Sequence, residues 1–144
     1  IAGGVIARTK AAVIVVPDNY QYRPIRDIVL AIGSMSFSRS AVLDPLRKLV
    51  RMLPAEVNVL HIAENTKPDL DEALDNIEDL KPTVTYAFST GSVNERLNEF
   101  LEKENIGMLC LVSNNRGFFS RLFNESITLK QTFSSPVPLL ILHD

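Results

Sequence analysis

Five short apolar runs recur along the chain between residues 28 and 142. Most of them lack the apolar–polar alternation of a half-exposed strand, which is typical of strands buried on both faces of a parallel sheet. We predict strands at Ile28–Ile32, Val57–Ile62, Thr83–Phe88, Met108–Val112 and Leu139–Leu142. The third run, TVTYAF, does alternate, and we expect it to lie nearer a sheet edge.

Stretches with helical spacing lie between these strands. One helical face contains Val42, Leu43, Leu46, Leu49, Val50 and Leu53. Pro45 lies near the start of this helix, where its missing N–H costs least. Further helices are predicted over residues 69–79, after a capping box at Ser92-Val93-Asn94-Glu95, and from about 125 to 133. Strands that alternate with helices of this length predict an α/β fold, with right-handed crossovers and a parallel sheet covered on both faces.

The first 23 residues stand outside this alternation. Ala11–Val16 is predicted to be a further strand, and the polar segment 18–23 a linker. A short helix followed by AVIVVP is similar to the chain's own end, a helix followed by VPLLIL, which is a weak internal repeat.

The amino-acid composition argues against nucleic-acid and membrane partners. The chain has 144 residues, of which 46% are hydrophobic and 22% charged, and its net charge is −2. It therefore lacks the basic excess of a nucleic-acid-binding protein. No apolar run approaches the roughly 20 residues of a membrane span, and the first residues make a poor signal peptide. We expect no nucleic-acid partner, no membrane partner and a cytoplasmic location.

The small net charge hides an acidic middle section. Residues 1–51 hold eight basic and three acidic residues, whereas residues 52–105 hold four basic and twelve acidic ones. The acids between 69 and 79 could form a docking face for a basic partner. We favour a solvated helix face, because the same segment carries an apolar stripe at helical spacing, made of Leu70, Ala73, Leu74 and Ile77.

No constellation of catalytic or metal-binding residues is evident. Cys110 lies inside an apolar strand and is interpreted as a buried structural thiol. His61 lies at a strand end near the expected cleft, where it could contact a ligand, although we favour a hydrogen-bonded structural histidine. His143 is expected to be exposed near the chain end. The two histidines have no carboxylate or thiol at a recognised metal-binding spacing, so we expect no metal site and no catalysis.

Short motifs along the chain resemble those of the universal stress proteins. The matching segments are IVLAI (28–32) for the first strand, VLHI (59–62) for the second, IGMLCLV (106–112) for the fourth, RLFNES (121–126) for the entry to the last helix and PVPLLIL (136–142) for the last strand. The resemblance covers residues 24–144. It implies a three-layer α/β/α, Rossmann-like or flavodoxin-like fold with a five-stranded parallel sheet in the order 3-2-1-4-5. It also implies that residues 1–17 are the end of a preceding copy, as in tandem proteins of a Bacteroidetes-like type.

The resemblance further implies association through the last strand. In this family, last strands commonly pair antiparallel across a dimer. The unpaired N–H and C=O groups of an edge strand can form hydrogen bonds with another strand. We expect a homodimer, a pseudo-dimer with an upstream copy, or a monomer whose N-terminal strand pairs antiparallel with its own last strand. The residues expected at this contact are Val13, Ile14, Val15, Leu139, Leu140 and Ile141.

Many family members bind ATP through a glycine-rich loop after the fourth strand and an Asp that ends the first. Here the Asp position falls on Gly33, the loop glycines fall on Val112, Asn115 and Glu125, and the final hydroxyl is retained as Ser126. Valine tolerates positive φ poorly, and a carboxylate at 125 would compete with phosphate for a helix N-terminus. The positions of this degenerate nucleotide site are Gly33, Ile62, Val112, Asn115, Gly117, Glu125 and Ser126.

Two functions of different classes remain open. The first is a non-catalytic module of the bacterial stress response that acts through dimerisation or protein association and needs no cofactor. The second is a stress regulator that binds ATP or another adenine nucleotide and has at most slow ATPase activity. We favour the first, because the phosphate loop is degraded while the core motifs are intact.

Overall fold

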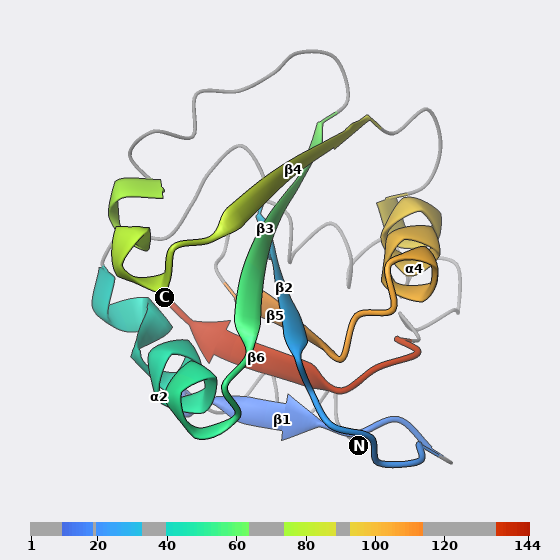
Figure 1. Ribbon diagram of the computed structural model, residues 1–144, viewed down its shortest axis with the longest axis horizontal. Helices are drawn as coiled ribbons and strands as arrows, with labels where there is room; N and C mark the ends of the chain where they lie inside the picture. Colours follow the sequence, from blue (N-terminus) through green and yellow to red (C-terminus); the bar gives the residue numbers. More distant parts are fainter. Residues whose placement is uncertain (1–9, 19, 33–39, 64–73, 89–92, 114–134) are drawn as a thin grey trace.

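The computed structural model describes residues 10–18, 20–32, 40–63, 74–88, 93–113 and 135–144. Its strands are β1 (Val13–Val15), β2 (Asp27–Ile32), β3 (Glu56–Ala63), β4 (Thr83–Phe88), β5 (Met108–Ser113) and β6 (Leu139–His143). Its helices are η1 (Ser40–Leu43), α2 (Asp44–Met52), η2 (Glu78–Leu80) and α4 (Val93–Lys103), where η marks a 3-10 helix (Figure 1). No helix within these ranges has the length and apolar character that a membrane crossing requires.

The strands form one mixed sheet in the order β1-β6-β5-β2-β3-β4 (Figure 1). Neighbours among β2 to β6 are parallel, whereas β1 is antiparallel to β6. Counted from β2 as the first strand, the parallel part has the order 3-2-1-4-5. The predicted fold class is therefore confirmed, together with the antiparallel N-terminal strand. The strand β4 lies at a sheet edge, as its alternating sequence predicted.

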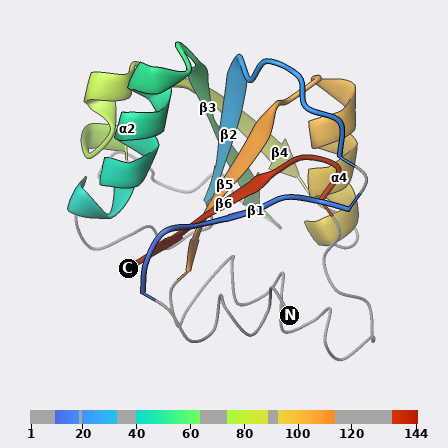
Figure 2. The same ribbon diagram turned by 90° about the horizontal axis from the view of Figure 1, so that it is seen from below.

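Two apolar layers cover the two faces of the sheet, because successive side chains of a strand point to opposite faces. In β2, for example, Val29 belongs to one layer and Leu30 to the other. Leu101 of α4 packs in the first layer, here called the α4 layer, and Leu46 of α2 packs in the second, the α2 layer. Figure 2 shows these helices on opposite sides of the sheet, which is the predicted three-layer arrangement.

The apolar face of α2 is also as predicted. Pro45 occupies the first turn, where its missing N–H leaves no helical hydrogen bond unmade. The α2 layer contains Val42, Leu43, Leu46, Leu49, Val50 and Leu53.

A residue in the left-handed conformation follows the C-terminal end of α4. Asn105 has a φ of 53°, and the Ile106 amide donates to the Leu101 carbonyl at 3.2 Å, which is the hydrogen bond of a Schellman cap. Arg23 donates from Nη1 to Asn105 Oδ1 at 3.2 Å and from Nη2 to the Ile106 carbonyl at 3.5 Å. A cation is favourable at a helix C-terminus, so the end of the predicted linker is attached to the folded unit here.

Gly107 allows the chain before β2 to pass close to the start of β5. A Cβ at this position would lie 3.2 Å from the Cα of Ile25. The Gly107 amide donates to the Asp27 carbonyl at 3.0 Å. A larger residue would therefore push β5 away from the start of β2.

Several predicted features lie outside the described residues. These are the capping residue Ser92, the helix predicted from about 125 to 133, and the first part of the acidic helix at 69–79. The described part of that segment is helical at 74 and 75, forms a turn at 76 and 77, and enters η2 at Glu78, so the predicted helix does not continue to 79. Ile77 is fully buried, whereas Asp75 and Glu78 are exposed, which agrees with the predicted apolar and solvated sides.

Candidate functional site

The carboxyl ends of β2, β3 and β5 lie where doubly wound sheets bind ligands. β2 pairs with β3 on one side and with β5 on the other, so the strand order reverses there. Five candidate nucleotide positions fall outside the described residues, namely Gly33, Asn115, Gly117, Glu125 and Ser126. Ile62 and Val112 are the two candidate positions that the structure describes.

Ile62 and Val112 are packing residues on opposite faces of the sheet. Ile62, near the end of β3, is 5% exposed and belongs to the α4 layer. Val112 of β5 is half-buried and packs against the α2 layer. It pairs in register with Leu142 of β6 and does not adopt the positive φ that a loop glycine would permit. The structure therefore does not bring these two side chains together.

His61 is buried beside the α2 layer. It is 2% exposed and pairs in register with Ile32 of β2 and Tyr86 of β4, which both belong to that layer. Its ring centroid lies 6.3 Å from that of Tyr86. Burial lowers the pKa of His61, although a hydrogen bond with the backbone of Ile32 acts in the opposite direction. Nδ1 has no hydrogen-bond partner among the described residues. Burial and the hydrogen bond with Ile32 agree with a structural histidine, which stays a prediction.

Burial of His61 predicts lower stability in acid. Its pKa is below 6.5 in the folded protein and near 6.5 in the unfolded chain, so the unfolded chain takes up the proton first. The contribution of His61 to stability is complete above about pH 6.5 and falls as the pH drops toward the folded pKa, by at most about 1.4 kcal/mol per pH unit. Urea unfolding between pH 7.5 and 5 measures this, and His61→Gln should show a shallower pH dependence than the wild type. An unchanged dependence in that variant would contradict the assignment.

The expectation that His143 is exposed is wrong. The strand β6 runs one residue farther than predicted, and His143 pairs in register with Ser113 of β5. The ring is consequently half-buried, its Nε2 has no partner among the described residues, and burial lowers its pKa.

Cys110 is confirmed as a buried thiol. It is 0% exposed in the middle of β5, and burial raises its pKa far above neutral. The thiolate that nucleophilic chemistry requires is therefore not formed at physiological pH.

The six residues predicted at the association contact pair with one another within this chain. The register is Val13 with Ile141, Ile14 with Leu140, and Val15 with Leu139. Val13 and Val15 pack against the α4 layer, whereas Ile14 is 49% exposed. The edge of β6 is thus occupied by the chain's own N-terminal strand, and β1 becomes the edge of the described sheet.

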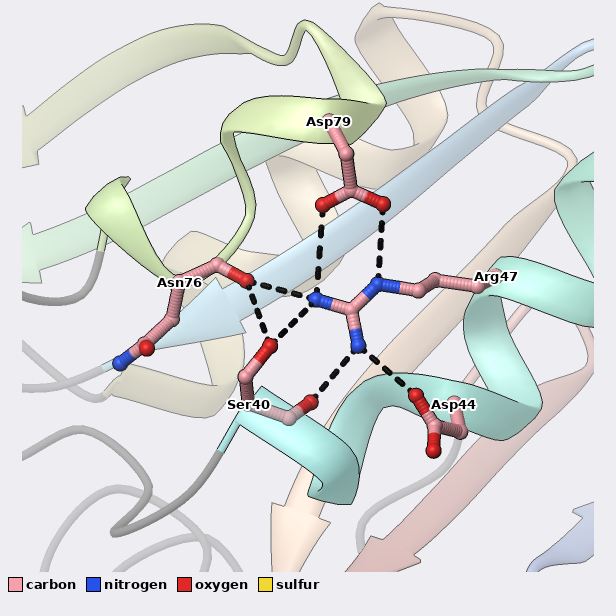
Figure 3. Close-up of polar contacts among 5 residues, drawn as sticks. All are labelled: Ser40, Asp44, Arg47, Asn76 and Asp79. Atoms are coloured by element: carbon pink, nitrogen blue, oxygen red, sulfur yellow. Dashed lines mark hydrogen bonds and ion pairs between the residues drawn. The ribbon is translucent and has the colours of Figure 1, made fainter.

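A polar cluster around Arg47 joins the start of α2 to the turn before β4 (Figure 3). The Arg47 side chain is 13% exposed. Its Nε donates to Asp79 Oδ2 at 3.0 Å, and its Nη1 donates to Asp44 Oδ1 at 2.9 Å and to the Ser40 carbonyl at 2.7 Å. Its Nη2 donates to Ser40 Oγ at 2.7 Å and to the Asn76 carbonyl at 2.6 Å.

All three guanidinium nitrogens of Arg47 are used within this cluster. Burial by itself would lower the pKa of Arg47, but the hydrogen bonds to Asp79 and Asp44 outweigh it and raise the pKa. Arg47 therefore keeps its positive charge, and its N–H groups donate to other residues of the cluster. The arrangement is therefore a structural clamp and not an open site for a phosphate.

The role of Arg47 was not predicted from the sequence. The available signal was its position four residues after Leu43 and three before Val50, which places a cation within the apolar stripe of α2, where it needs a partner. The solvated-face interpretation holds for Asp75 and Glu78, but Asp79 also binds Arg47, although its side chain is 55% exposed. A pair 32 residues apart in sequence carries no local pattern that would identify it.

A pocket of about 620 Å³ lies at the opposite, amino ends of β2 and β3. It is formed by the segment before β2 and the turn from α2 to β3, and its walls include Tyr22, Asp27, Met52 and Glu56. No pattern in the sequence predicted a pocket in this region. Within the described ranges, no group of three or more His, Cys, Asp or Glu side chains could hold a metal ion.

No protein-family model and no curated protein matches the sequence. Solved structures do match the fold, at low identity. A universal stress protein from Archaeoglobus fulgidus DSM 4304 matches with a TM-score of 0.61 and 19% identity, over 96% of this chain and 51% of that one. A universal stress protein from Archaeoglobus fulgidus matches with a TM-score of 0.50 and 13% identity, over 81% and 93% of the two chains. The chain has the universal stress protein fold. A third structure with this fold, from Archaeoglobus fulgidus in complex with dAMP, has a TM-score of 0.50 and 14% identity, over 83% and 99%.

The universal stress protein fold accounts for the order of the motifs found in the sequence. The five parallel strands lie within residues 24–144, the range to which those motifs were matched. The chain spans about half the length of the first of these structures. A shared fold hosts many functions, so function here depends on the individual residues.

Proposed function

We propose that this chain is a universal stress protein module of the bacterial cytoplasm that acts through association and not through catalysis. The observation that carries the proposal is the antiparallel pairing of β1 with β6, which joins strands from opposite ends of the chain through apolar side chains. An added antiparallel strand of this kind is how two sheets associate edge to edge.

The state of the reactive side chains supports a non-catalytic role. Nucleophilic catalysis needs a hydroxyl or thiol beside a base, in reach of substrate. Cys110 and His61 are both buried, and the pKa of Cys110 is raised. Packing within the sheet therefore explains the positions of both side chains.

We also propose that residues 1–17 are the end of a preceding copy, 18–23 the linker and 24–144 the module itself. In this arrangement β1 takes the place of the last strand of an upstream copy, and its contact with β6 is a pseudo-dimer contact. A homodimer formed directly through β6 would require β1 to leave or to be exchanged between copies.

An adenine-nucleotide-binding regulator with at most slow ATPase activity is the second candidate. The observation in its favour is the similar structure that is a complex with dAMP. The nucleotide would lie at the carboxyl ends of the strands.

Titration calorimetry with ATP separates the two candidates. We expect no binding in the micromolar range, because Glu125 and Val112 replace loop glycines. The double variant Asn115→Gly/Glu125→Gly should raise any ATP affinity by about tenfold or more, since it restores backbone freedom and removes a competing anion. Glu102→Gln, at an exposed position of α4, removes one charge elsewhere and should change nothing. Micromolar affinity of the wild type would favour the regulator instead.

A further inference from the structure

The pocket at the amino ends of β2 and β3 has the size and the lining of a small-molecule site. Its volume of about 620 Å³ lies within the range of ligand pockets, roughly 300–1,000 Å³. Six of its nine lining residues are apolar or aromatic, and the other three are charged. All nine lie in described parts of the chain, around the start of β2 and in the turn from α2 into β3 (Figure 2). In such a pocket the few charged groups select and orient the ligand.

Two large apolar side chains in the walls of this pocket are open to solvent. Tyr22 is 77% exposed and Met52 76% exposed, which makes them the two most exposed large apolar side chains of the described ranges. They come from different segments, one from the stretch before β2 and the other from the end of α2. Exposed apolar groups gathered at one concavity are typical of a binding site, because a ligand that covers them removes apolar area from water.

Two carboxylates lie side by side in the same pocket. Asp27 is the first residue of β2 and pairs in register with Glu56, the first residue of β3. The next residues, Ile28 and Val57, both belong to the α2 layer, so the two acidic side chains point to the other face, on strands about 4.8 Å apart. Neither carboxylate forms an ion pair with another described residue. Adjacent like charges repel, and a cation bound between them would remove the repulsion.

The lining favours an organic cation over a metal ion. A divalent ion such as Mg²⁺ or Ca²⁺ takes six or more oxygen ligands, and the described residues offer no group of three or more His, Cys, Asp or Glu that could hold one. An ammonium group has three N–H donors and can bridge two carboxylates. The third charged lining residue, Arg26, leaves the lining with one net negative charge.

We propose that this pocket binds a small organic cation, namely a primary amine that carries an apolar body. Its ammonium group lies between Asp27 and Glu56. Its apolar body contacts Tyr22 and Met52. The site goes beyond the proposed function and does not depend on it. Because β2 has six residues, its two ends lie about 20 Å apart, and ATP at the carboxyl ends of the strands should not displace the amine.

Chemical-shift mapping by NMR with 2-phenylethylamine and 2-phenylethanol tests the site. The two probes have nearly the same shape and differ in the charge of one terminal group. The amine should shift backbone amide signals in the ranges 22–27 and 52–56, and excess ATP should leave those shifts unchanged. The dissociation constant of the amine should be at least about tenfold lower than that of the alcohol, because only the amine pairs with the carboxylates.

Charge variants identify the groups that recognise the amine. Asp27→Asn and Glu56→Gln should each weaken amine binding by about fivefold or more, and both should leave binding of the alcohol unchanged. Arg26→Gln should strengthen amine binding by about two- to fivefold, since it removes a repelling cation. Glu78→Gln is the matched control, because it removes an exposed carboxylate outside the pocket and should change nothing. Circular dichroism checks that each variant is folded.

Several outcomes would overturn the amine site. These are equal affinities for the amine and the alcohol, an amine affinity that is the same in Glu56→Gln and Glu78→Gln, displacement of the amine by ATP, and no shift of amide signals in the ranges 22–27 and 52–56. None of them bears on the proposed association, which is tested separately by titration with ATP.

Discussion

Replacing Arg47 by methionine is expected to lower the free energy of unfolding by about 2–4 kcal/mol. The substitution keeps most of the side-chain volume but removes the hydrogen bonds to Ser40, Asp44, Asn76 and Asp79. The carbonyl oxygens of Ser40 and Asn76 would lose a charged donor in a partly buried cluster, where an unmade hydrogen bond is costly. The carboxylates are more than half exposed and can turn to water, which keeps the expected loss below that of a fully buried ion pair.

Arg96→Met is the matched control for this prediction. Arg96 forms an ion pair with Glu99 at the same i,i+3 spacing as Arg47 with Asp44, but its side chain is 48% exposed. Its loss should cost no more than about 0.5 kcal/mol. Urea unfolding of both variants gives the comparison. Equal effects would mean that the cluster around Arg47 is an ordinary surface feature.

A lysine at position 47 separates charge from geometry. Lysine keeps the cation, but its three N–H donors lie on a single nitrogen and cannot reproduce the planar fork of five donors that arginine offers. We expect Arg47→Lys to recover less than half of the stability lost in Arg47→Met. Combining Arg47→Met with Asp79→Asn in a double-mutant cycle measures the coupling of those two side chains.

Truncation of Leu30 is expected to cost about 3–5 kcal/mol of unfolding free energy. Leu30 lies in β2, is 0% exposed and pairs in register with Val59 on one side and Cys110 on the other. Strands flank it on both sides, so the surrounding structure has little freedom to close the cavity that alanine leaves.

Chemical denaturation of Leu30→Ala and Met52→Ala makes this measurement. Met52 is 76% exposed at the end of α2, and its truncation should change stability by no more than about 0.5 kcal/mol. A small loss in Leu30→Ala would indicate that the core rearranges to fill the space, which a strand held between two neighbours does not readily permit.

The sequence identified the described strands because burial on both sheet faces produces an unbroken apolar run. It placed the edge strand β4 correctly through the alternation of TVTYAF. It also paired β1 with β6 in the correct sense, on the strength of the family resemblance. The error at His143 arose because strand ends depend on whether a neighbour continues the hydrogen-bonded ladder, and here Ser113 does.

The candidate site was less accessible to sequence reasoning. The nucleotide positions were assigned by analogy with a loop motif, and the two that are described, Ile62 and Val112, lie on opposite sheet faces. The clamp at Arg47 joins two segments about 30 residues apart, 40–47 and 76–79, and such a long-range polar contact leaves no periodic signal.

By itself the sequence determined the layers of this protein, because apolar periodicity follows directly from which faces are buried. Tertiary structure alone decided that Arg47 binds Asp79 and that Ile14 and Val16 remain exposed. The physical reason is that periodicity records how much of a side chain is buried, whereas hydrogen-bond partners and free edges depend on which distant segments meet in space.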